Sequence, residues 1–199
     1  MAVTKAQICN MALGHINQSG TTISNLDTDQ GNTADQCRIH YDNARRFVLA
    51  DHDWNFGGKR VALTDIGSPS ALWTYRYDYP SDCLRIREIE RLSKTDVAVP
   101  YEVSALGTGD KLVIQSDLAS AICLYSWDVV LPTMFSPGFV TALSWYLASE
   151  LAPALSGDRD IQQAALSVYD NYKRSAKAAD SSEGLPDVEI DSPWEQART

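Results

Sequence analysis

The chain has 199 residues, a net charge of −9 and a pI near 4.7, with 44% hydrophobic and 22% charged residues. These values predict a soluble globular protein with a sizeable core, and the acidic charge argues against diffuse binding to nucleic acid or anionic membranes. No stretch reaches the roughly 20 apolar residues that cross a bilayer, and the N-terminus lacks a signal-peptide pattern, so we expect folding in a cytosol and no membrane partner.

Apolar periodicity predicts two N-terminal helices. The first runs from Thr4, a candidate N-cap, to Asn17. Its inward face is expected to hold Ile8, Cys9, Ala12, Leu13 and Ile16. The second begins at Thr33 as N-cap and lasts about five turns. Its apolar stripe is expected to hold Cys37, Tyr41, Ala44 and Val48, and its charged outer face Arg38, Asp42, Arg45 and Arg46.

The architecture changes after the second helix. Two aromatics, Trp54 and Phe56, precede a pair of glycines. After the glycines, apolar residues recur at every second position, the pattern of a β-strand. The clearest alternation is that of Tyr75, Tyr77 and Tyr79, and residues 107–110 read as a hairpin turn. We therefore expect a small antiparallel β-domain over residues 59–131, inserted between two helical parts.

Two further helices follow. Ser136 and Pro137 predict the start of a third helix that ends near Leu155, with a kink or an early end at Pro153. The short turn at 156–158 makes a fourth helix its antiparallel neighbour. The fourth helix is expected to bury Ile161, Ala164, Ala165, Val168, Tyr169 and Tyr172.

Residues 180–199 are expected to form a flexible acidic arm. They carry a net charge of −5 and two prolines that exclude a continuous helix. Spaced along the arm are four apolar anchors, Leu185, Val188, Ile190 and Trp194. Such an arm either remains in solvent or docks onto another chain.

Signatures of enzyme chemistry are absent, so we predict no catalytic residue, no metal and no cofactor. His15, His40 and His52 lack metal-ligand spacing, and Asp51 and Asp53 beside His52 are more simply the exposed end of a helix. The cysteines Cys9, Cys37, Cys83 and Cys123 are far apart in the sequence and read as free thiols in a reducing compartment.

Several residues are candidates for interaction. Trp54 and Phe56, followed by Lys59 and Arg60, suggest either a platform for nucleic-acid bases or core aromatics that fix the β-domain to the helices, and we favour the core. The tyrosines at 75, 77 and 79 lie either on an open sheet surface or in a subunit interface. Arg45 and Arg46, with Asp42, are expected to form charge pairs with Glu88, Glu90 and Arg91, within the chain or between subunits.

The first third of the chain resembles a known family. Residues 41–46, with Tyr-Asp and Ala-Arg-Arg, the HDWNF sequence at 52–56 and the basic pair at 59–60 carry the likeness, together with Ala-Leu at 12–13 and Gly-Asn-Thr-Ala-Asp at 31–35. They are similar to the tail tubular protein A family, the head-to-tail adaptors of tailed bacteriophages. None of these residues is a catalytic signature.

The resemblance implies an α+β fold: a bundle of about four helices formed by residues 1–58 and 132–179, an inserted antiparallel β-domain at 59–131, and an extended arm at 180–199. It further implies a non-enzymatic structural protein of the virion, assembled in the host cytoplasm. Copies would form a ring, in the family commonly of twelve subunits, between the portal protein and the tail nozzle or next tail component. Genome DNA would pass through its lumen without sequence-specific binding, and the arm would dock on the portal.

Two other classes of function remain open. A small cytosolic enzyme or ligand-binding domain would hold a pocket between the helices and the β-domain. A DNA-binding packaging accessory would show salt-sensitive affinity for DNA, which the acidic charge disfavours.

Overall fold

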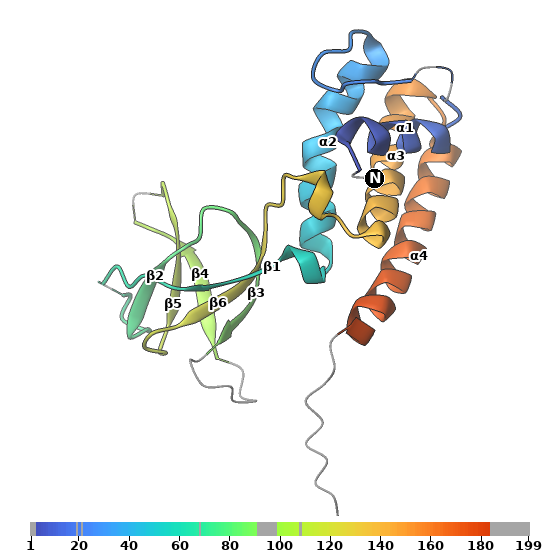
Figure 1. The fold of residues 1–199 in the computed structure, drawn as a ribbon. Coiled ribbons are helices and arrows are strands. Elements are labelled where there is room, and N and C mark those ends of the chain that lie inside the picture. The colour runs from blue at the N-terminus through green and yellow to red at the C-terminus, as the bar shows by residue number, and fades with distance from the viewer. Residues whose placement is uncertain are drawn as a thin grey trace, which may run out of the picture.

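The computed structural model describes residues 3–18, 20, 22–67, 69–90, 99–107 and 109–183, with residues 176–183 described without their side chains. This part of the chain contains four α-helices and two three-stranded antiparallel sheets, which confirms the α+β class. The helices form one body and the strands a second unit beside it (Figure 1). No helix within these residues is long and apolar enough to cross a membrane.

The first two helices differ in how they begin. Helix α1 (Lys5–His15) is capped by Thr4, whose hydroxyl accepts a hydrogen bond from the Gln7 amide, as expected from the sequence. Helix α2 (Asn32–Asp51) begins after Gly31, which has φ 115°. The prediction that Thr33 is the N-cap is therefore wrong: the left-handed conformation that only glycine adopts readily starts the helix two residues earlier.

The last two helices lie where they were predicted, but the fourth continues to Glu183. Residues 180–183, predicted to belong to the arm, are helical because they contain no Pro or Gly that would end the helix. Helix α3 (Pro137–Leu155) is capped by Ser136, whose hydroxyl accepts from the Phe139 amide at 3.3 Å. The early end that Pro153 suggested does not occur, because the helix continues through this proline to Leu155. Helix α4 (Arg159–Glu183) begins after a short turn that contains Gly157 with φ 67°. The two helices lie side by side (Figure 1).

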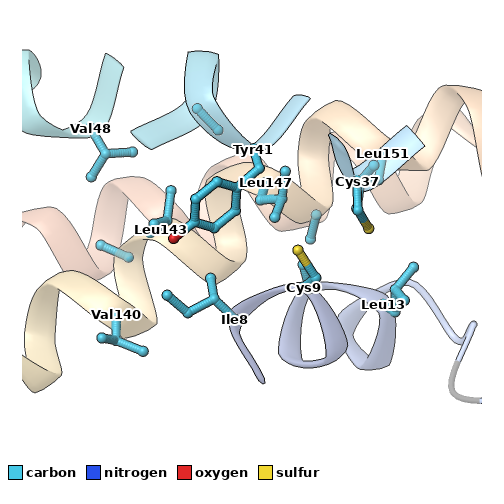
Figure 2. Close-up of a cluster of buried hydrophobic side chains, with 14 of the residues drawn as sticks. Ile8, Cys9, Leu13, Cys37, Tyr41, Val48, Val140, Leu143, Leu147 and Leu151 are labelled. Atoms are coloured by element: carbon cyan, nitrogen blue, oxygen red, sulfur yellow. The ribbon is translucent and has the colours of Figure 1, made fainter. Parts of the chain in front are cut away.

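Helix α3 is the centre of the helical body, with α2 and α4 flanking it and α1 lying across it (Figure 1). Figure 2 shows the side chains that meet there. The predicted inward faces of the first three helices are buried, but two of the residues expected inside α4 are not: Ala164 is exposed and Tyr172 is 44% exposed. Helix α4 makes most of its contacts with α3, so a narrower stripe suffices to bury its contact face.

The six strands form two sheets. The first has the order β1-β6-β3, built from β1 (Gly58–Ala62), β6 (Ile122–Trp127) and β3 (Cys83–Glu90). The second has the order β2-β5-β4, built from β2 (Tyr75–Asp78), β5 (Leu112–Ser116) and β4 (Tyr101–Ala105). β4 and β5 are antiparallel neighbours on either side of the expected hairpin turn, where Gly109 has φ 76°.

The β-unit has a core of its own. It is composed of side chains from both sheets and from the loop before β6: Tyr77, Ile89, Ile114, Ala121, Cys123 and Tyr125. A separate and larger cluster fills the helical body. Because each unit buries its own apolar side chains, the two units are held together by contacts at their joint.

Candidate interaction surfaces

Aromatic side chains join the β-unit to the helical body. Trp54 lies between α2 and β1 and is 1% exposed, and its indole N–H donates to the Val48 carbonyl at 2.8 Å. Its ring meets that of Phe139 edge-on at 5.1 Å, and Phe56 packs on the same phenylalanine at 5.1 Å. The core reading of these aromatics is confirmed for Trp54, because a buried ring cannot stack on nucleic-acid bases.

A buried arginine is the polar part of the joint. Arg45 is 1% exposed, forms an ion pair with Asp128, and donates to the Val129 carbonyl at 2.7 Å. Arg46, which is exposed, reaches the other Asp128 oxygen at 2.9 Å. The prediction that Arg45 lies on the outer face is therefore wrong: the segment after β6 covers that side of α2 and supplies the anion that a buried guanidinium needs.

A second set of charges ties β3 to the end of α2. Asp53 forms ion pairs with Arg85 and, at 3.0 Å, with Arg87. Arg87 also donates to the Trp54 carbonyl at 2.8 Å. These contacts hold the first sheet against the helical body at a point distant in sequence from Asp128.

Within the described part of the chain, Glu90 does not pair with the charges of α2. Its carboxylate accepts from Arg60 on β1, with the closest contact at 3.0 Å, and these hydrogen bonds together with the charge of Glu90 raise the pKa of Arg60. Arg60 and Glu90 lie on the two edge strands of one sheet, which explains the pairing. Arg91 lies outside the described residues.

The tyrosine row does not form one exposed surface. Tyr77 is 1% exposed in the β-core and donates its hydroxyl to the Leu118 carbonyl. Tyr75 and Tyr79 are half-buried, and the Cys83 thiol donates to the Tyr79 hydroxyl at 3.1 Å. Of the candidate interface residues, Tyr77 and Arg45 lie inside the chain, and the exposed side chain of Arg46 is the most open to a partner.

A carboxylate clamps α2 to α4. Asp51 accepts from the Tyr169 hydroxyl at 2.6 Å and from the Lys173 ammonium at 2.7 Å. Burial opposes ionisation of Asp51, but the hydrogen bonds from these two partners outweigh it and lower the pKa of the carboxyl. Asp51 and Asp53 are therefore both engaged in ion pairs that join elements of the fold.

The three histidines occupy separate surroundings. His15 stacks on Trp145 at 3.6 Å, His40 lies 3.8 Å from the Glu150 carboxylate, and His52 meets Trp54 edge-on. The described residues contain no group of three or more His, Cys, Asp or Glu that could hold a metal ion.

One histidine makes a contact that resembles a catalytic pair. The His15 Nε2 atom lies 3.1 Å from the Ser144 hydroxyl. That hydroxyl donates to the Thr141 carbonyl at 2.8 Å and is buried, and burial lowers the pKa of His15. Because the serine proton is already committed and substrate has no access, the pair is structural.

Two open cavities lie on the helical body. One, of about 490 Å³, is lined by residues of the α1 segment: Val3, Gln7, Asn10 and Met11. The other, of about 390 Å³, lies before and around the start of α2, at residues 22–34. Neither lies between the helices and the β-unit, where a ligand-binding protein of the alternative class was expected to hold its pocket.

Sequence reasoning missed two exposed apolar surfaces. The first, here called the joint patch, consists of Val130, Leu131 and Met134, which are 48%, 62% and 43% exposed. The second lies on β4 and β5 and consists of Tyr101, Val103 and Leu112. The apolar run at 129–131 before Pro132 was the available signal for the joint patch. The predicted arm anchors Leu185, Val188, Ile190 and Trp194 lie outside the described residues.

Compared with models of known protein families and with curated protein sequences, the chain matches none.

Proposed function

We propose that this chain is a structural protein of a bacteriophage virion, a head-to-tail adaptor whose copies form a ring between the portal protein and the tail. The observation that carries the proposal is the resemblance of residues 31–60 to the tail tubular protein A family, together with the place of that segment in the fold. Residues 52–60 form the joint at which α2 passes into β1, and the Arg45 of the resembling helix is the buried cation of the same joint.

The proposal gives the joint a mechanical role. Copies in a ring transmit force between portal and tail only if the helical body and the β-unit keep a fixed orientation. The buried Trp54, the Arg45–Asp128 pair and the Asp53 ion pairs oppose relative movement of the two units. The net charge of −9 is compatible with passage of DNA, because a wall that bound phosphates tightly would retard it.

Ring contacts in this proposal use the joint patch. Three exposed apolar side chains follow Asp128, whose carboxylate the exposed Arg46 reaches, and a protein–protein interface combines such apolar and charged groups. We expect Leu131→Asp to prevent assembly while leaving the circular dichroism spectrum unchanged. The matched control is Leu72→Asp, at a position that is 82% exposed in the β-unit; assembly of both variants would contradict the role of the joint patch.

The arm is proposed to bind the portal through Leu185, Val188, Ile190 and Trp194. The contacts of one arm with the portal are weak, but a ring repeats them in every subunit. Removing them is therefore expected to weaken binding and to leave folding unchanged. We expect a chain that ends at residue 183 to keep its unfolding temperature and lose co-sedimentation with purified portal rings. A full-length variant with the four apolar anchors changed to serine separates their contribution from that of the acidic charge. Undiminished binding by both variants would refute this part of the proposal.

A further inference from the structure

Two buried thiols meet between α1 and α2. Cys9 and Cys37 are both 0% exposed and both free. Figure 2 shows the Cys9 and Cys37 side chains extending from α1 and α2 into the space between the two helices. The two residues are distant in sequence, so their contact is made by the fold.

The surroundings make the two thiols unequal. Hydrogen bonding of a Cys37 thiolate by the Cys9 thiol outweighs burial at Cys37, so it lowers the pKa of Cys37 and raises that of Cys9. The positive charge of Lys5 acts on Cys9 and lowers its pKa, but it does not outweigh the contributions that raise it. Cys37 is therefore the better nucleophile of the pair, and Cys9 lies where a second thiol is needed to complete a disulfide.

We propose that Cys9 and Cys37 form an oxidation site, at which a low-molecular-weight disulfide such as oxidised glutathione converts the two thiols into an intramolecular cross-link between α1 and α2. The proposal does not depend on the function proposed above. It assigns these cysteines a chemistry beyond that of small buried side chains.

The reaction is a pair of thiol–disulfide exchanges. The Cys37 thiolate attacks one sulfur of oxidised glutathione, forms a mixed disulfide and releases the first glutathione thiolate. The Cys9 thiolate then attacks the Cys37 sulfur of that mixed disulfide, forms the Cys9–Cys37 bond and releases the second glutathione. The protein loses two electrons and two protons, and the glutathione disulfide gains them as two thiols.

Burial sets when the exchange occurs. Since neither sulfur reaches solvent in the folded chain, α1 must open, or the chain must be refolding, before oxidised glutathione has access. Helix α1 has only 11 residues and is the shortest of the four described α-helices, so its local opening is the smallest movement that exposes the pair.

The test uses the full-length chain, unfolded in guanidinium and refolded in a buffer that contains reduced and oxidised glutathione, so that burial cannot block the reaction. Free thiols are then alkylated without reduction and the protein is digested with trypsin. Residues 6–37 contain no Lys or Arg, so both cysteines lie in one peptide, 6–38. We expect this peptide to carry no alkyl group and to weigh two hydrogen atoms less than its reduced form.

The unfolding temperature provides a second readout. A native-like cross-link that closes a loop of roughly 30 residues is expected to raise it by about 10 °C over the reduced protein. Cys83→Ala, which removes the half-buried thiol of the β-unit, should leave the cross-link intact, and Cys9→Ala should abolish it. Two alkyl groups or glutathione adducts on peptide 6–38 would overturn the proposal. A cross-link that lowers the unfolding temperature would also overturn it.

Discussion

At the scale of single residues, Tyr41 and Tyr169 differ in the partners of their hydroxyl groups. Both are nearly fully buried in the helical body. Within the part of the chain that the structure describes, the Tyr41 hydroxyl has no hydrogen-bond partner, whereas that of Tyr169 donates to Asp51 at 2.6 Å. A buried polar group without a partner opposes folding, and one that is paired favours it.

We therefore expect opposite effects from the same chemical change. Tyr41→Phe should leave the free energy of unfolding unchanged or raise it by up to about 1 kcal/mol, and Tyr169→Phe should lower it by about 1–2 kcal/mol. Urea unfolding followed by circular dichroism measures both. A clear loss of stability in Tyr41→Phe would show that its hydroxyl is satisfied.

Sequence periodicity placed both tyrosines on inward helix faces, which the structure confirms. It had no means of separating their roles, because the partner of Tyr169 belongs to α2, 118 residues earlier. The same limit applies to Ala164 and Tyr172 of α4. Which part of an apolar stripe is covered depends on how many helices pack against it, and that number is a property of the fold.

At the scale of elements, the start of α2 depends on one glycine. Gly31 has φ 115°, and a Cβ added there would meet no atom within 4 Å, so any cost of substitution comes from the backbone alone. Gly14 lies in α1 with equal space around it and without a positive φ. We expect Gly31→Ala to lower the free energy of unfolding by about 1 kcal/mol or more, and Gly14→Ala to raise it by about 0.5–1 kcal/mol. Thermal unfolding of the two variants side by side checks both signs, and stabilisation of both would contradict the role of Gly31.

Local signals predicted the other helix starts well. Thr4 and Ser136 cap α1 and α3 as expected. A side-chain cap depends on a few adjacent residues only, so the sequence is sufficient to predict it. Thr33 satisfied the same rule, but it is not the N-cap, because the helix already begins after Gly31. A glycine two residues before a candidate cap is the signal that would have corrected it.

The clamp between α2 and α4 should make stability depend on pH. The pKa of Asp51 is lower in the folded chain than its ordinary value near 3.8. At a pH between the folded and the unfolded pKa, the unfolded chain therefore binds more protons than the folded chain. The clamp therefore stabilises the fold above about pH 4 and loses its effect as the pH falls below. The difference in unfolding free energy between wild type and Asp51→Asn should shrink over that range. Asp170→Asn, which removes a carboxylate 3.7 Å from Lys173, is the control and should keep the wild-type pH profile.

At the scale of the whole molecule, the ion pair of Arg45 and Asp128 is the joint between two units with separate cores. Asp128→Asn leaves a buried guanidinium without its anion and should lower the free energy of unfolding by about 3 kcal/mol. The matched control is Asp42→Asn, which removes the exposed carboxylate 3.4 Å from the same arginine and should cost less than about 1 kcal/mol. Guanidinium unfolding distinguishes the two, and equal effects would mean that the joint does not depend on Asp128.

The sequence predicted both units of the molecule but not the way they are joined. The change of period at Gly57 and the aromatics before it indicated the transition from helix to sheet. The partners of Arg45 and Asp53 could not be read from the sequence, because Asp128 and Arg85 lie 83 and 32 residues further along the chain. The interleaved strand order of the two sheets, β1-β6-β3 and β2-β5-β4, was equally beyond reach of local patterns.

The measurement that tests the proposed function most directly is the mass of the purified 21.9-kDa chain by light scattering, alone and after mixing with the cognate portal ring. The adaptor proposal predicts that the portal gains a fixed whole number of chains that closes a ring. A chain with verified fold and intact arm that leaves the mass of the portal unchanged would contradict the proposal.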